Sequence, residues 1–123
     1  MAASQSGTFT LNFTTAAGVL RSLILPITSF TLVGDTYAQN LQSIATTAGG
    51  VAINLGGVAV RWLAIINRDA TNYVDILTAV SGTAFARLKP GEGMLLPLNS
   101  GITAPAGQAN TAAVEIEILG IIT

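Results

Sequence analysis

The chain has 123 residues, a formal net charge of −1, and neither cysteine nor histidine. These values exclude a disulfide framework and a thiolate metal site, remove the commonest general base and metal ligand, and give no electrostatic case for nucleic-acid binding. Charged residues make up 9% of the chain and hydrophobic residues 50%, whereas an average soluble domain has about 25% charged residues. We therefore expect other subunits to cover part of the apolar surface; the alternative is a surface of Thr, Ser, Asn and Ala.

The start of the chain is small and polar and shows no targeting segment. Residues 1–7 lack the basic start and apolar core of a signal peptide, so we expect a flexible arm there, followed by a single domain over residues 8–123. The uncharged run of residues 36–60 is long enough to cross a bilayer, but its Asn and Gln side chains and paired glycines argue against insertion. The sequence predicts production in a cytoplasm and no membrane partner.

The first half of the chain predicts a series of short strands. Residues 8–13 alternate strictly, with apolar side chains at every second position, which is typical of a strand. Residues 37–46 also allow a helix, but no capping residue begins one and the neighbouring segments are strands, so a strand is favoured. The predicted strands are residues 8–13, 19–25 (ending before Pro26), 27–33, 37–46 and 51–55.

The second half is organised around residues 58–98, which contain the single Trp and the clearest turn signals. Residues 58–67 form an apolar run that suits a strand buried on both faces. Gly, Pro and Ala without periodicity predict a long surface loop over residues 99–110, and alternation over residues 112–119 predicts a half-buried last strand. The other predicted strands are residues 73–78, 84–88 and 93–98, with turns at 67–72, 81–83 and 89–92.

Short strands separated by frequent turns predict an all-β fold, a single-domain β-sandwich that is jelly-roll-like. Two turns carry structural residues. Asn67, Asp69 and Asn72 can bond their own backbone, while Pro90 restricts φ and Gly91 tolerates positive φ. The same Asn and Asp side chains supply oxygens for a calcium site, but one charged ligand is too few, so turn formation is favoured.

The acidic residues offer the main alternative of catalysis. Paired carboxylates hydrolyse glycosides, and Asp69 with Asp75, or Glu115 with Glu117, would be the candidates for a small hydrolase. Their positions in turns and on a half-buried strand are explained by structural roles. No His or evident Lys activates a Ser or Thr nucleophile, and no phosphate-binding motif follows the glycine pairs. We therefore predict no catalytic residue, no cofactor, no metal ion and no enzymatic activity.

Three residues are candidates for contacts with other proteins. Trp and Arg dominate interface hot spots, and Trp62 follows Arg61. Trp62 shares its predicted face with Val60 and Ile66, which favours a place in the core. Arg61 and Arg21 fall on outward faces and are the better interface candidates.

Turn and core signals between residues 44 and 98 follow one pattern. An apolar strand precedes N-x-D-A-T-N-Y-V, a short strand, F-x-x-L-x-P-G-E and a further apolar strand, and the stretch I-A-T-T-A-G-G-V-A-I-N-L-G lies upstream. This pattern resembles a group of small structural proteins of tailed-phage virions. The resemblance implies a structural protein of the phage virion. Within that class we favour a capsid decoration (cement) protein that binds between capsomers and reinforces the head through many weak contacts. Its partner would be the major capsid protein or another virion protein, as a homo-oligomer (trimer or dimer), and its location the virion, assembled in the host cytoplasm.

Two other functions stay open at this point. A phage tail or fibre subunit is compatible with the same resemblance. A carbohydrate-binding module is compatible with a β-sandwich, but it would need aromatic side chains on an exposed face. Beyond the four Phe residues, the chain offers Trp62, Tyr37 and Tyr73.

Overall fold

The computed structural model describes residues 4–31, 37–56, 60–99 and 105–121, which form ten β-strands and no helix. The all-β class predicted from the sequence is confirmed. Within these residues no helix has the length and apolar character that a membrane crossing needs. The chain divides into two compact units, residues 1–35 and 36–122, which are described separately. The strands are β1 (Ser4–Thr14), β2 (Leu20–Thr31), β3 (Tyr37–Ile44), β4 (Val51–Ala52), β5 (Trp62–Asn67), β6 (Val74–Leu77), β7 (Ala84–Leu88), β8 (Gly93–Pro97), β9 (Ala106–Ala109) and β10 (Val114–Ile121).

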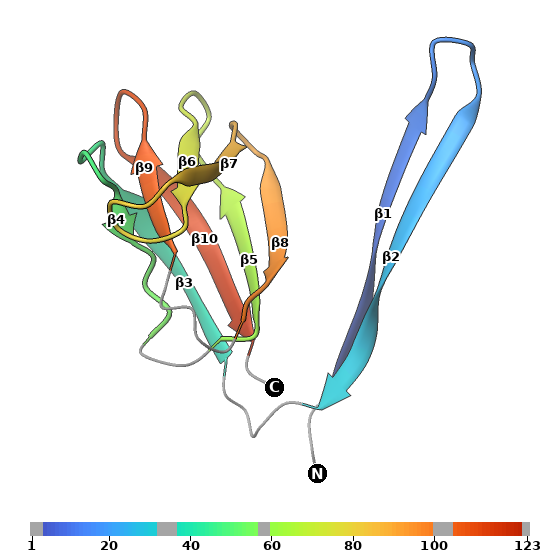
Figure 1. Ribbon diagram of the computed structural model, residues 1–123, viewed down its shortest axis with the longest axis horizontal. Helices are drawn as coiled ribbons and strands as arrows, with labels where there is room; N and C mark the ends of the chain where they lie inside the picture. Colours follow the sequence, from blue (N-terminus) through green and yellow to red (C-terminus); the bar gives the residue numbers. More distant parts are fainter. Residues whose placement is uncertain (1–3, 32–36, 57–59, 100–104, 122–123) are drawn as a thin grey trace. The chain divides into compact units, whose positions relative to one another are not determined.

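The first unit contains an antiparallel hairpin of β1 and β2 (Figure 1). The Thr15 amide donates to the Val19 carbonyl oxygen (2.9 Å) and closes the turn between them. β2 continues through Pro26, so the prediction that a strand ends before this residue is wrong. A hairpin consists only of edge strands, where proline is tolerated because its missing N–H can lie on the unpaired side.

The structure describes only some of the N-terminal residues at which the sequence predicts boundaries. β1 includes residues 4–7, which the sequence assigns to a flexible arm. Residues 1–3 and the end of the predicted strand 27–33 lie outside the described residues. The arm and the single domain over residues 8–123 stay predictions.

The second unit is a sandwich of two four-stranded antiparallel sheets (Figure 1). The first sheet has the order β3-β10-β5-β8 and the second has the order β4-β9-β6-β7. Counted from β3, the strands therefore follow the orders 1-8-3-6 and 2-7-4-5, which is the arrangement of a jelly roll with two Greek keys. The β-sandwich predicted from the sequence is confirmed.

The core lies between the two sheets and follows the two-residue period of the strands. On β10, Val114, Ile116 and Ile118 are buried while Glu115 is exposed, which confirms the half-buried strand predicted over residues 112–119. The other large side chains of the core come from both sheets and their connections: Ile44, Ile53, Leu55, Val60, Leu63, Ile65, Val74, Ile76, Leu88 and Leu98.

Two predictions about the core are wrong. The sequence predicts burial of both faces at residues 58–67, but β5 buries only alternate residues, and Trp62 and Ile66 belong to the half-buried set. Trp62 therefore lies on the outer side of the sheet rather than in the core. The loop predicted over residues 99–110 contains β9, a mostly buried strand. Its small Ala and Gly residues give no apolar alternation from which a strand could be predicted.

Side-chain amides attach the segment after β4 to the first sheet. The sequence predicts a strand over residues 51–55, but the ladder ends at Ala52. The Ile53 amide still donates to the Pro105 carbonyl oxygen (2.9 Å). Gln42 adds two bonds to the same segment, because its Nε2 donates to the Ala52 carbonyl oxygen (2.9 Å) and its Oε1 accepts from the Asn54 amide (2.8 Å). One side chain thus supplies the donor and the acceptor that a peptide group of a neighbouring strand would supply.

The turn between β7 and β8 contains Pro90 and Gly91. The Glu92 amide donates to the Lys89 carbonyl oxygen (3.0 Å), and Gly91 has a φ of 78°. The Glu92 carboxylate also accepts from the Lys89 amide (2.8 Å). Pro90 occupies the second position of the turn, where its ring restricts φ.

Replacing Gly91 by Val is expected to lower the free energy of unfolding by about 1–3 kcal/mol, because a β-branched residue is strained at positive φ. A Cβ at this position would have no other heavy atom within 4 Å, so the loss comes from the backbone alone. Gly91→Asn is the matched control, since Asn tolerates this conformation. Glu92→Gln keeps a carbonyl acceptor and should change stability little. Urea denaturation measures all three, and equal stability of Gly91→Val and the wild type would contradict the strained turn.

Candidate interaction surface

The outer face of the first sheet is largely apolar. The backbone register aligns Leu119 of β10 with Ala64 of β5 and Leu95 of β8. Leu41 of β3 lies opposite Glu117 of β10 in the neighbouring row. These residues alternate with the buried ones, so they face away from the core. We refer to Leu41, Trp62, Ala64, Ile66, Leu95 and Leu119 together as the apolar outer face.

Two members of the apolar outer face are exposed, and they lie on the two edge strands of the sheet. Leu41 on β3 is 60% exposed and Leu95 on β8 is 38% exposed. The members on β5 and β10, between them, are half-buried. Each of the four strands therefore contributes apolar side chains to this face, and Glu117 of β10 lies between Leu41 and Ile66. Contiguous apolar patches on soluble proteins mark contacts with other molecules, so this face is the candidate interaction surface.

Charged side chains occupy one end of this face. Arg68 Nε donates to Glu117 Oε2 (2.7 Å), and Glu115 is exposed two residues before Glu117 on β10. An exposed ion pair contributes about 0–1 kcal/mol to stability. Its placement is the more informative property, because it leaves the row through Leu119 and Ala64 without a charged side chain.

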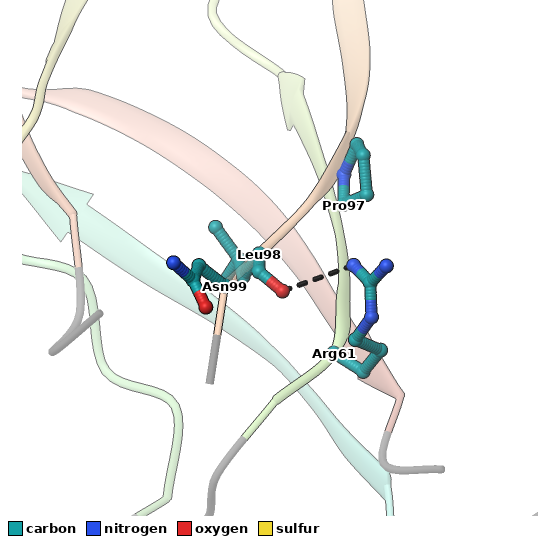
Figure 2. A pocket seen from close by; sticks show the side chains of 4 residues that line it. All are labelled: Arg61, Pro97, Leu98 and Asn99. Carbon is teal, nitrogen blue, oxygen red and sulfur yellow. Dashed lines mark hydrogen bonds between the residues drawn. The ribbon is translucent and has the colours of Figure 1, made fainter. Parts of the chain in front are cut away.

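Arg61 lies beside a shallow depression at the end of β8 (Figure 2). Its Nη1 donates to the Leu98 carbonyl oxygen (2.9 Å), and its Cζ lies 5.4 Å from the centroid of the Trp62 ring. The depression has a volume of about 450 Å³ and is also lined by Pro97 and Asn99. Arg61 is exposed, as the sequence predicts, but one of its hydrogen bonds holds the chain after β8.

Arg21, the other cation predicted to contact a partner, belongs to the first unit. It lies on β2, opposite Phe13 in the backbone register, and it is exposed. Arg21 and Arg61 therefore belong to different units, and each is a separate candidate.

The second sheet carries a polar network on its outer side. Arg87 of β7 donates to both carboxylate oxygens of Asp75 on β6, at 2.7 and 3.0 Å. The bonds to Asp75 raise the pKa of Arg87 above its ordinary value. The Arg87 Cζ lies 3.9 Å from the centroid of the Tyr73 ring. Arg87 thereby covers one face of an aromatic ring that a carbohydrate-binding site would use.

The structure brings Asn67, Asp69 and Asn72 together in the turn between β5 and β6. Asn67 Nδ2 donates to the carbonyl oxygens of Asn72 (2.9 Å) and Leu88 (3.0 Å), and its Oδ1 accepts from the Asp69 amide (2.8 Å). Asp69 Oδ1 accepts from the amides of Thr71 (2.7 Å) and Asn72 (2.6 Å). Of the oxygens considered as calcium ligands, those of Asn67 and Asp69 thus accept bonds from the backbone of their own turn, and Asn72 Oδ1 accepts from the Thr111 hydroxyl (2.7 Å).

The other acidic side chains bind neighbouring groups as well. Asp75 and Glu117 each bind an arginine, and Glu92 accepts a backbone amide. Among the residues that the structure describes, no three acidic side chains gather as a metal site would require. Asp35 lies outside the described residues. Three of the carboxylates considered for hydrolysis, Asp69, Asp75 and Glu117, therefore have structural partners, while Glu115 is exposed on β10.

The apolar outer face is the feature that sequence reasoning missed. Its signal is present in the sequence, because adjacent apolar residues such as Leu95 and Leu96 place one side chain on each face of a strand. The same pattern predicts a strand buried on both faces. It cannot separate burial within the chain from burial against another molecule.

No family model, no curated protein and no solved structure matches this chain. The residues and their geometry therefore carry the functional proposal.

Acid is expected to weaken the turn that Asp69 holds. Hydrogen bonds from the amides of Asn72 and Thr71 lower the pKa of Asp69 below its ordinary value of 3.8. A carboxylate with a depressed pKa in the folded state adds stability above its unfolded pKa, and this stability is lost as the pH falls through the folded pKa. Urea denaturation between about pH 5 and about pH 2 should therefore show a larger loss of unfolding free energy for the wild type than for Asp69→Asn.

Glu115→Gln, on an exposed strand position, controls for the change in net charge in this comparison. Equal acid dependence of the wild type and Asp69→Asn would contradict the role of the carboxylate in the turn.

Proposed function

We propose that the protein is a non-enzymatic structural protein of a tailed-phage virion, and specifically a capsid decoration (cement) protein that binds between capsomers. Its partner is then the major capsid protein, and it works as a homo-oligomer, a dimer or trimer, in virions assembled in the host cytoplasm. The apolar outer face carries this proposal, since it exposes Leu41 and Leu95 on a chain with only 9% charged residues.

Two further features support the proposal. The pattern of turns and strands between residues 44 and 98 resembles small virion structural proteins. Jelly rolls also serve as viral capsid domains, although they occur in lectins and other proteins too. A fold does not imply a function. The proposal therefore depends first on the apolar outer face, and the fold and the sequence pattern give additional support.

The energetics of the apolar outer face suit a protein that acts in many copies. Full burial of one Leu side chain contributes about 1.5–3 kcal/mol. A few such contacts barely exceed the cost of associating two proteins. A decoration protein overcomes this limit because an oligomer binds several equivalent sites at once, which raises its overall affinity.

The alternatives receive less support. A tail or fibre subunit would use the same apolar outer face on a different partner, so only binding experiments separate it from a decoration protein. A carbohydrate-binding module would need open aromatic rings. Arg87 covers Tyr73 at 3.9 Å, and Trp62 is half-buried with Arg61 at 5.4 Å from its ring.

Leu95→Lys is expected to weaken binding to phage heads by about tenfold or more, because it replaces an apolar contact with a charge that must lose its water. Phe85→Lys is the matched control. It removes a side chain that is 47% exposed from β7 of the second sheet, and it should bind as the wild type does. Co-sedimentation with purified heads that lack the chain measures the binding of all three proteins.

Each outcome of this experiment decides between the alternatives. Equal binding of Leu95→Lys and the wild type would contradict the role of the apolar outer face. Binding to purified tails and not to heads would favour the tail or fibre subunit. Binding to neither would overturn the proposed function.

A further inference from the structure

Three of the four edge strands of the sandwich are protected against pairing with another chain. β4 has two residues. β7 has five residues, carries the Asp75-bound Arg87, and pairs with β6 through an irregular register after Ile76. β8 has five residues and ends at Pro97. Short edges, charges, bulges and proline are the devices that prevent edge-to-edge association of β-sheets.

β3 is the fourth edge strand, and it has none of these devices. Its eight residues pair with β10 in an unbroken antiparallel register (Figure 1). Its sequence, Y-A-Q-N-L-Q-S-I, contains no charged residue, no proline and no glycine. In the described residues, no strand follows β3 on its other side in the sheet order. A long, regular, uncharged edge is a template for one more strand.

We propose that β3 pairs antiparallel with β3 of a second copy of this chain, about a two-fold axis at Leu41. The inference rests on the self-assembly in the proposed function and specifies its contact. The two first sheets then form one continuous eight-stranded sheet, and the apolar outer faces of the two copies lie on the same side of it. Such an interface is isologous, because each copy offers the same strand to the other.

The residues of β3 favour a second copy as the occupant. Directly opposite residues of an antiparallel pair share a face, so an axis perpendicular to the sheet pairs odd-numbered residues with odd-numbered ones. An axis at Leu41 sets Leu41 against its own copy and Gln39 against Ser43, so that apolar meets apolar and polar meets polar. A shift of the axis by one residue would set Leu41 against Gln39 or Ser43 and leave a large side chain, 60% exposed, without an apolar partner.

Electrostatics permit this self-pairing. A charged edge strand would face the same charge on its copy, whereas β3 carries no charge. On the neighbouring strand β10, the acidic residues are Glu115 and Glu117. The two β10 strands of the pair are separated by three strand spacings, or about 14 Å. This distance exceeds the Debye length of about 8 Å at physiological ionic strength, so repulsion between the copies is screened.

Cysteine cross-linking tests the pairing, because the chain has no cysteine of its own. Residues opposite each other on antiparallel strands have Cα atoms about 4.5–5.5 Å apart, which is within the range of a disulfide. Leu41→Cys should therefore form disulfide-linked dimers as the main product of mild oxidation. Phe85→Cys is the control on the edge strand β7 and should form no disulfide-linked dimer under the same conditions.

The register of the pair has its own test. Gln39→Cys and Ser43→Cys should each fail to cross-link alone, because either residue lies about 14 Å from its own copy. An equal mixture of the two variants should form the mixed dimer. Leu41→Lys sets two charges against each other at the axis, and it should at least halve the fraction of dimer seen for the wild type in sedimentation equilibrium.

The outcomes separate this inference from the proposed function. If the wild type self-associates or binds heads, but Leu41→Cys cross-links no more than Phe85→Cys, edge pairing through β3 is wrong and the proposed function stands. A wild type that stays monomeric at high concentration, with no cross-linking of Leu41→Cys, also overturns the pairing. The proposed function falls with it only if binding to heads is absent as well.

Discussion

The buried amide of Asn67 is the contact on which one end of the sandwich depends. Asn67 is 0% exposed. It lies on β5 of the first sheet and donates to the Leu88 carbonyl oxygen at the end of β7, in the second sheet, and to that of Asn72 before β6. Its backbone amide donates to the Glu92 carbonyl oxygen, and its carbonyl oxygen accepts from the Gly91 amide, both in the turn between β7 and β8. One residue thus joins two sheets and two turns, and each buried carbonyl left unpaired would cost about 1–3 kcal/mol.

This arrangement concentrates polar and charged groups away from most of the first sheet. The turns hold Asp69 and Glu92, the second sheet holds the Asp75–Arg87 pair, and the ion pair of Arg68 lies at one end of the first sheet. The middle of the outer side of the first sheet is apolar, and the polar Gln39 and Ser43 lie on its edge strand β3. The low charge of the chain, visible in its composition, appears in the second unit as a largely apolar outer face and an uncharged edge strand.

Much of the fold could be predicted because its signals are local. Alternation identified β10, and the turn around Gly91 identified the boundary between β7 and β8. β9 could not be predicted, because Ala and Gly residues become a buried strand only when two neighbouring strands pack around them. The place of Trp62 was predicted wrongly for a similar reason, since periodicity shows which residues share a face but not which face the second sheet covers.

The central claim is that the chain works by assembly through the apolar outer face. An electron cryo-microscopy reconstruction of phage particles that contain the chain tests this claim most directly. The account predicts jelly-roll density on the head, with protein density within van der Waals contact of Leu95 and Leu119. A reconstruction in which this face is open to solvent, or in which the chain is absent from purified particles, would contradict it.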